Sequence, residues 1–248
     1  MVWTSKKWLF RTASLLCPIT PLVSSLTHFI VSWKEKSRLF LVMNWVKVIL
    51  AITFLILMLI VKFGGFIQEA DVEQPDDLLH NWTRGINRYA MQHTSFRSAW
   101  QITSSLMLDI QFFMTLGLYM WKGFSLRIIL TLVMFYSIRA LLQQLFILPF
   151  PDDFFWESPG FPCLMNVYGR QSDFFYSGHV GFSLLCTIEN FMMGVRYAGY
   201  FGIAATCFQA FTLITFQVHF TIDVFTGLVM AHYCYHVCQY PAVWLDKK

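Results

Sequence analysis

The chain has 248 residues, of which 56% are hydrophobic and 13% are charged, and its formal net charge is +4. This composition excludes an ordinary soluble enzyme, and so small a positive charge, confined to flanks and loops, does not favour a nucleic-acid partner. Because a membrane-crossing helix needs about 20 apolar residues, the length accommodates six or seven spans within one domain. We therefore predict an all-α, polytopic integral membrane protein with a six-transmembrane-helix bundle.

The first 45 residues are expected to form a cytosolic or interfacial segment. The apolar run 8–33 is interrupted by Pro18 and Pro21, and no small-residue cleavage site follows it, so the pattern does not favour a cleavable signal peptide. We expect this run to lie on the cytosolic face of the membrane; an additional span there is the alternative. The six-span domain is predicted over residues 46–240, and residues 241–248 are predicted to be a cytosolic tail.

Six apolar stretches define the predicted spans. Lys and Arg concentrate before the first span, between the second and third, after the fourth and at the C-terminus, which assigns these segments to the cytosol. The fourth and sixth spans then both start from the outer face, and the two long outer connections are predicted to be loops. The predicted spans are 46–63, 100–121, 126–148, 177–195, 199–218 and 220–240.

Two short polar clusters interrupt these apolar stretches. Residues 173–179 read Asp-Phe-Phe-Tyr-Ser-Gly-His, and residues 219–223 read His-Phe-Thr-Ile-Asp. Ionisable groups are costly within a membrane and usually mark a functional site. Since His179 and His219 both begin spans that start from the outer face, we expect them at the same depth in the membrane.

The spacing of His219 and Asp223 predicts a histidine that is oriented by an acid. Residues four apart share one face of a helix, so the Asp223 carboxylate can hold one ring nitrogen and leave the other nucleophilic. His179 can then protonate a departing alkoxide. Ser177 and the backbone at Gly178, near a helix N-terminus, can hold a phosphate. Phosphoryl transfer needs little more than such a set. The alternative is that each polar residue only caps or satisfies a helix end.

These motifs resemble the signatures of the sphingomyelin synthase family, a branch of the lipid phosphatase superfamily. Residues 172–185 are similar to its third signature and residues 219–224 to its fourth. Arg139 with Leu-Pro-Phe-Pro at 148–151 is similar to the second, and residues 74–77 are faintly similar to the first. Plant phosphatidylcholine:diacylglycerol cholinephosphotransferases share the Arg, Leu-Pro-x-Pro, Ser-Gly-His and His-x-Thr-Ile-Asp pattern.

The resemblance implies a lipid phospho-headgroup transferase with its site on the luminal or exoplasmic side of an endomembrane (ER or Golgi) or the plasma membrane. It implies transfer of phosphocholine or phosphoethanolamine from a membrane glycerophospholipid to ceramide through a phosphohistidine. His219 would be the nucleophile, Asp223 its orienter and His179 the general acid. No metal or organic cofactor is expected, and a homo-oligomer is left open. Diacylglycerol as the acceptor, and hydrolysis as in a phospholipase C or a lipid phosphatase, are the alternatives.

Three further charges fall within predicted spans. Asp109, Arg139 and Glu189 lie at similar depths by residue count, and buried intramembrane charges usually pair with one another. We predict that Arg139 bridges Asp109 and Glu189, in a structural or substrate-positioning role. The alternative for Asp109 is a position that faces the two catalytic histidines.

Aromatic residues crowd the predicted outer face. They suit either an interfacial aromatic belt or binding of the quaternary ammonium of choline, with Tyr176 as a candidate. Asp173 is a candidate partner for the cation of either choline or ethanolamine. The aromatic residues are Phe154, Phe155, Trp156, Phe174, Phe175 and Tyr176.

A second histidine pair lies on the predicted sixth span. His232 and His236 are four residues apart and so lie about one helical turn from each other. No acid nearby completes a metal-binding set, and the pair is expected near the cytosolic end of the span. The sequence therefore does not favour a metal site there.

Overall fold

The computed structural model describes residues 45–50, 52, 53, 56, 76–123, 125–146, 149–151, 153–166, 168, 169 and 175–246 of the chain. Contacts divide the chain into two units, residues 1–54 and 55–248. In the first unit residues 45–50 are helical, at the start of the predicted first span, and residues 1–44 of the predicted N-terminal segment lie outside the described residues. The second unit carries the candidate site.

The described part of the second unit is helical, which confirms the all-α prediction. Helices α4 to α8 correspond to the last five predicted spans, with ends that differ by a few residues. Three of them, α4, α5 and α7, are long and apolar enough to cross a membrane; the count of six spans stays a prediction. The bounds are α3 Leu78–Gln92, α4 Thr94–Lys122, α5 Arg127–Leu145, α6 Gly178–Met192, α7 Arg196–Thr215 and α8 Thr221–Asp246.

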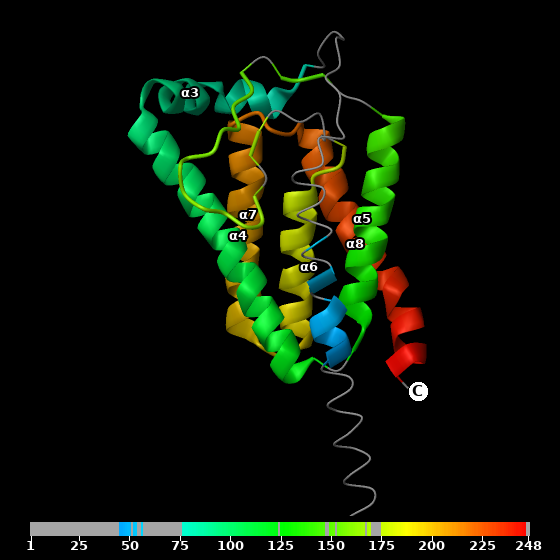
Figure 1. The fold of residues 1–248 in the computed structure, drawn as a ribbon. Coiled ribbons are helices and arrows are strands. Elements are labelled where there is room, and N and C mark those ends of the chain that lie inside the picture. Colours follow the sequence, from blue (N-terminus) through cyan, green and yellow to red (C-terminus); the bar gives the residue numbers. More distant parts are fainter. Residues whose placement is uncertain are drawn as a thin grey trace, which may run out of the picture. The chain divides into compact units, whose positions relative to one another are not determined.

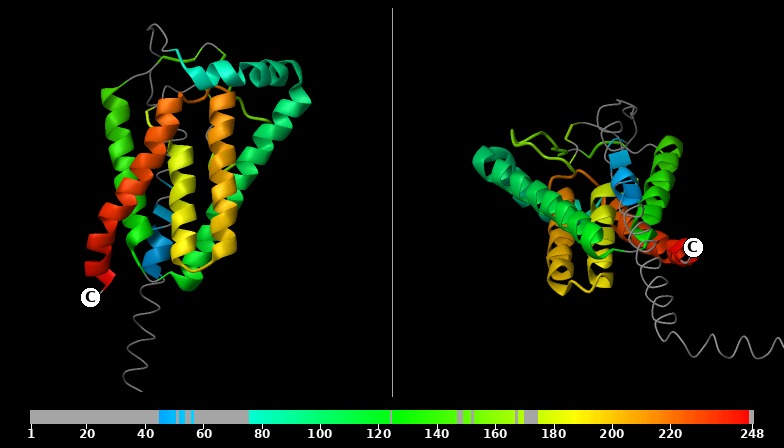
Figure 2. Two further views of the ribbon diagram at one scale, coloured as in Figure 1. Left: turned by 180° about the vertical axis from the view of Figure 1, so that it is seen from behind. Right: turned by 60° about the horizontal axis from the view of Figure 1, so that its bottom comes forward.

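Helix α6 is central in this bundle. It packs against α4, α5, α7 and α8, and the views from front and back agree on this arrangement (Figures 1 and 2). It has 15 residues, which corresponds to about 22 Å and is shorter than the ~30 Å hydrocarbon core of a bilayer. The first turn of α6 is covered by the neighbouring helices, because Gly178, Val180 and Gly181 are buried.

Polar side chains hold α6 against α4 and α7. Gln111 of α4 donates from Nε2 to the Ser183 carbonyl at 2.8 Å and to Thr187 Oγ1 at 3.0 Å. Ser183 donates in turn to Gln111 Oε1 and shares a hydrogen bond with Thr206 of α7. A side chain at Gly202 of α7 would collide with Thr187, so glycine permits the close approach of the two helices. Small residues and hydrogen-bonded side chains are the usual means of packing helices in a membrane.

Helix α3 occupies part of a connection that the sequence pattern predicts to be a loop. It lies across the end of the bundle at which α4 and α8 begin (Figure 1). Its N-cap is Asp77, whose Oδ1 accepts from the amides of Leu79 and His80. The buried stripe of α3 consists of His80, Asn87 and Ala90. The stretch is nevertheless strongly amphipathic at helical spacing, so the helix is detectable from the sequence, and the loop prediction is wrong here.

Candidate active site

The two histidines singled out by the sequence lie side by side. His179 is the second residue of α6, and His219 belongs to the irregular connection 216–220 between α7 and α8. Their ring centroids are 6.4 Å apart, and the rings are inclined at 64° to each other. His219 is 1% exposed, whereas His179 is half-buried. The two rings are thus close enough for one small group to lie beside both of them.

Asp223 faces His219 from the first turn of α8. Its Oδ2 lies 3.8 Å from His219 Nδ1, which is within ion-pair range and longer than a hydrogen bond. The same oxygen accepts from the Phe220 amide at 3.0 Å and so caps α8. Catalytic contacts are often long in the absence of substrate. The fully buried carboxylate can therefore serve both as a helix cap and as the group that orients the imidazole.

The start of α6 is attached directly to the start of α8. The Ser177 amide donates to the Asp223 carbonyl at 3.0 Å. A Cβ atom at Gly227 would lie 2.6 Å from the Ser177 carbonyl oxygen, and one at Gly181 would lie 3.1 Å from the Gly227 carbonyl oxygen. Only glycine fits at such distances, so two glycines on facing helices bring the Ser-Gly-His segment to the His219 side.

Arg139 of α5 places a buried cation at the N-terminus of α6. Its Nε donates to the Tyr176 carbonyl at 2.8 Å, and its side chain is 7% exposed. A Cβ atom at Gly178 would lie 3.1 Å from Arg139 Nε and 3.2 Å from Cζ, so glycine lets the guanidinium lie against the first turn of the helix. A helix N-terminus and an arginine both favour bound anions. The arrangement suits a phosphate next to His179.

We expect Gly178→Ala to lower the rate of any phosphoryl transfer at this site by about tenfold or more, because the added methyl displaces the guanidinium. The protein should still fold, since alanine favours a helix more than glycine does. Gly117→Ala is the matched control, because a Cβ atom there has nothing within 4 Å. Turnover and thermal unfolding of both purified variants give the answer. Wild-type turnover in Gly178→Ala would show that Arg139 need not touch the helix end.

The other predicted supporting residues have different surroundings. Ser177 is fully buried, and its Oγ has no hydrogen-bond partner among the described residues, so the hydroxyl is available to a ligand at the N-terminus of α6. Tyr176 is also fully buried; its hydroxyl donates to the Phe135 carbonyl at 2.6 Å, and its own carbonyl accepts from Arg139. Its contacts are those of a packing residue that supports Arg139. Asp173 lies outside the described residues.

The predicted bridge from Arg139 to Asp109 and Glu189 is wrong. Glu189 instead forms a two-oxygen ion pair with Arg127, at 3.0 Å for the shortest contact, and accepts from the Tyr235 hydroxyl. The prediction assumed that Glu189, about ten residues into its predicted span, lies near the middle of the membrane. Because α6 ends at Met192, Glu189 lies in its last turn, beside the start of α5 where Arg127 is located.

Asp109 accepts hydrogen bonds from the backbone of the connection between α5 and α6. Its two carboxylate oxygens accept from the amides of Leu164 and Met165 at 3.0 and 2.9 Å. One turn away on α4, Ser105 accepts from the Asn166 amide group and shares a hydrogen bond with Tyr168. The connection between α5 and α6 thus folds alongside α4, as Figure 1 shows. Non-helical backbone at membrane depth requires such partners within the protein. Asp109 therefore has a structural role here.

Trp156 lies beside His179, a contact that was not predicted. It is 3% exposed, and its ring centroid is 6.1 Å from that of His179 and 4.7 Å from that of Tyr168. The loop that carries it is fixed by a hydrogen bond from the Phe155 amide to the Phe216 carbonyl. An interfacial belt would leave the ring exposed, so for Trp156 the belt interpretation is wrong. No feature of the local sequence distinguishes it from Phe154 or Phe155.

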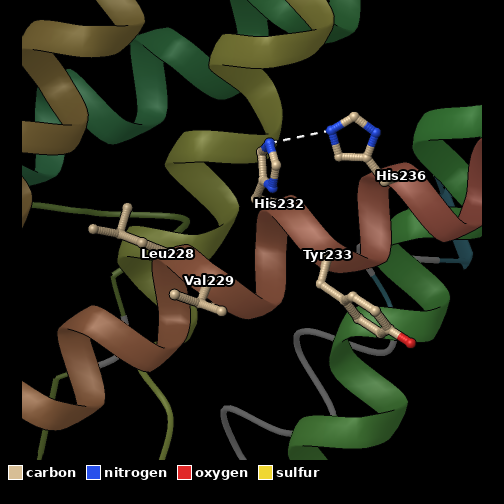
Figure 3. A pocket seen from close by; sticks show the side chains of 5 residues that line it. All are labelled: Leu228, Val229, His232, Tyr233 and His236. Carbon is tan, nitrogen blue, oxygen red and sulfur yellow. Dashed lines mark hydrogen bonds between the residues drawn. The ribbon is translucent and has the colours of Figure 1, made fainter.

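His232 and His236 lie far along α8 from these residues. Their Nε2 atoms are 3.1 Å apart and share a hydrogen bond, and both side chains are exposed (Figure 3). Leu228, Val229 and Tyr233 line the same shallow pocket. Among the described residues no cluster of three or more potential metal ligands is found.

Comparison with known proteins identifies one family. A model of the family described as AtPDCT1/2 matches residues 77–240, which is more than half of the chain. The matched region begins at the N-cap of α3 and ends within α8, so it contains both histidines, Asp223 and Arg139. Searches of curated proteins and of solved structures found no match.

Proposed function

The chain belongs to the AtPDCT1/2 family, the plant phosphatidylcholine:diacylglycerol cholinephosphotransferases, and from this premise we propose that it moves phosphocholine between diacylglycerol backbones. The observation that carries the proposal is the convergence of His179, His219 and the buried Asp223 at one end of a bundle of apolar helices. These groups suffice for transfer through a covalent histidine intermediate.

In the first step His219 Nε2 attacks the phosphorus of phosphatidylcholine. A P–N bond forms, the P–O bond to the glycerol oxygen breaks, and His179 gives its proton to that oxygen, so diacylglycerol leaves. In the second step a new diacylglycerol hydroxyl gives its proton to His179 and its oxygen attacks phosphorus. The P–N bond breaks, which regenerates His219 and releases a new phosphatidylcholine. Because both partners are of the same chemical class, the reaction exchanges headgroups and runs in either direction.

Fixed charges around the two rings assist both steps. Asp223 orients the His219 ring through Nδ1 and stabilises the positive charge that the ring acquires when Nε2 is substituted. Arg139 and the N-terminus of α6, with the Ser177 hydroxyl, lie where the phosphoryl oxygens become more negative. A phosphodiester carries one negative charge, which a single buried arginine can match.

We further propose six spans, with this end of the bundle on the luminal or exoplasmic side of an endomembrane or the plasma membrane. The distribution of Lys and Arg supports this orientation, because most basic residues of the chain lie before the first predicted span or at the opposite ends of the later spans. Arg84, Arg88 and Arg97 lie at the histidine end. Donor and acceptor lipids would then reach the histidines from the outer leaflet.

The identity of the acceptor distinguishes the candidate reactions of this site. The family match favours diacylglycerol over ceramide, the acceptor that the sphingomyelin synthase resemblance implies. Ethanolamine in place of choline, and water in place of a lipid acceptor, are chemically compatible with the same phosphohistidine.

We expect the purified protein to convert deuterated diacylglycerol into deuterated phosphatidylcholine when unlabelled phosphatidylcholine is the donor. Parallel reactions offer ceramide, no acceptor, or phosphatidylethanolamine as donor, and mass spectrometry measures every product. The rate with diacylglycerol should exceed the rates with ceramide and with water by about tenfold or more, since each missing complementary contact costs about that much. Sphingomyelin as the main product would reassign the acceptor, and release of phosphocholine alone would reassign the reaction to hydrolysis.

A further inference from the structure

The backbone that carries His219 has no regular secondary structure of its own. Residues 216–220 form a turn between α7 and α8, and Gln217 has a φ of 52°, a left-handed conformation that favours glycine. Within this connection the amides of Val218 and His219 both donate to the Leu213 carbonyl, at 2.8 and 3.3 Å. The position of the His219 ring therefore depends on what holds the turn from outside.

Helix α3 and its N-cap Asp77 contact this turn and the residues on either side of it. Asn87 donates from Nδ2 to the Thr215 carbonyl at 2.9 Å. His80 contacts the His219 carbonyl oxygen through Nε2 at 2.9 Å; because a carbonyl can only accept, Nε2 is the donor. Asp77 accepts from the Thr221 amide at 2.6 Å and from the Thr221 hydroxyl at 2.7 Å.

His80 also contacts the residue between these points. Its ring stacks on that of Phe220, with centroids 5.4 Å apart and planes inclined at 30°. The side chains of Asp77 and His80 thus contact residues 219, 220 and 221 in turn. The His80 side chain is buried, so its hydrogen bond to the His219 carbonyl is shielded from water.

The Asp77 carboxylate is suited to this contact at neutral pH. Burial raises its pKa, but hydrogen bonds from Thr221 and the adjoining His80 lower the pKa more, so that it lies below the ordinary value for an aspartate. The carboxylate is therefore ionised, and it accepts bonds from α3 and from α8 together. It joins the two helix N-termini at the residue that begins α8.

We propose that α3 is a positioning element for the nucleophile: Asp77 and His80 fix the turn that carries His219, and His80 does so through the carbonyl group of His219 itself. The proposal rests on the proposed role of His219 in phosphocholine transfer. Neither residue touches the reacting atoms. If α3 served only to cover the end of the bundle, an apolar residue at position 80 would serve as well, because a buried polar group has to find a partner.

The test replaces His80 in the full-length protein. His80→Phe keeps a ring for stacking on Phe220 and removes the donor to the His219 carbonyl; His80→Gln keeps an amide donor. His93→Phe is the matched control, because His93 is an exposed residue at the other end of α3 that stacks on Tyr89 and bonds the Tyr89 carbonyl. Thr221→Val, with Thr221→Ser as its conservative partner, removes only the hydroxyl donor to Asp77 and gives a second, milder variant.

We expect kcat for headgroup transfer to fall by about 10- to 100-fold in His80→Phe, with KM for both lipids within about twofold, because a displacement of ~1 Å at a reacting group costs that much. His80→Gln should recover most of the loss, and His93→Phe should match wild type. In Thr221→Val kcat should fall several-fold, and in Thr221→Ser it should stay close to the wild-type value. Turnover in His80→Phe and Thr221→Val equal to wild type would overturn the proposal, as would equal losses in His80→Phe and His80→Gln.

A measurement without lipid separates this proposal from the proposed function. Diethyl pyrocarbonate modifies accessible imidazoles, and mass spectrometry gives the rate at His219. We expect the rate of modification at His219 to rise several-fold in His80→Phe and to lie close to the wild-type rate in His80→Gln. This expectation holds whether or not wild type transfers a headgroup. Unchanged modification of His219 would overturn the positioning role; a changed rate in a protein that transfers no headgroup would overturn only the proposed function.

Discussion

Replacement of His219 by alanine is expected to abolish phosphocholine transfer, with a loss of at least ~10⁴-fold in turnover, because the proposed covalent intermediate is formed on the ring of this residue. The protein should still fold. The bonds that hold this position are made by the backbone amide and carbonyl, to Leu213 and His80, and alanine keeps both. The change leaves a cavity where a buried ring was, so a modest fall in thermal stability is expected.

The measurement follows both turnover and the intermediate. With phosphatidylcholine labelled at phosphorus, wild type quenched without acceptor should carry label that is stable in base and lost in mild acid, as a P–N bond requires. His219→Ala should carry none. His232→Ala is the control, because His232 is an exposed histidine on α8, remote from the site. Labelled protein in His219→Ala, or turnover near that of wild type, would place the nucleophile elsewhere.

Replacement of Asp223 by asparagine is the second large effect, with an expected loss of about 10²- to 10⁴-fold in kcat. The substitution separates the two roles of this residue. The asparagine oxygen can still accept from the Phe220 amide and cap α8, so the fold should persist. The negative charge near His219 Nδ1 is lost, so the ring is neither oriented nor stabilised when it becomes positive.

Pre-steady-state kinetics distinguishes this effect from simple loss of structure. Formation of the labelled phosphohistidine should slow in Asp223→Asn, while unfolding temperature and lipid KM remain close to wild type. Asp246→Asn is a matched control, because that aspartate caps the start of α5 near the opposite end of the bundle, through the Leu126 amide. If Asp223→Asn kept rapid phosphorylation, the carboxylate would be a helix cap and nothing more.

The sequence predicts those parts of this molecule that depend on local pattern. Apolar runs between charged flanks locate α4, α5, α6, α7 and α8 to within about six residues at each end. They do so because the tendency of a segment to leave water depends on its own apolar residues. The spacing of His219 and Asp223 predicts their proximity, but His219 lies in the connection before α8 and not on the helix face that was expected. The common position of the two histidines follows from counting spans, since each begins an element that starts from the same end of the bundle.

Other features depend on which elements meet, and they could not be predicted. The partner of Glu189 depends on how α5 lies along α6. Arg139 lies at the N-terminus of α6, and Glu189 lies about three turns further along, beside Arg127. The place of Asp109 depends on a loop that folds back along α4. Helix α3 has a detectable amphipathic pattern, but the pattern does not reveal that its buried His80 and Asn87 meet backbone groups at and just before the turn that precedes α8.

The close fit of Gly178 against the Arg139 guanidinium has a consequence for headgroup selection. A guanidinium and a helix end recognise phosphoryl oxygens, and these oxygens are identical in choline and ethanolamine lipids. Discrimination must then come from contacts around the headgroup nitrogen, two carbons and an oxygen away from phosphorus. Trp156, whose ring lies next to His179, offers an aromatic surface there, and a quaternary ammonium is the kind of cation that such a surface attracts. In this enzyme the anion subsite would thus be common to all phospholipids, and the identity of the lipid would be sensed at its cationic end.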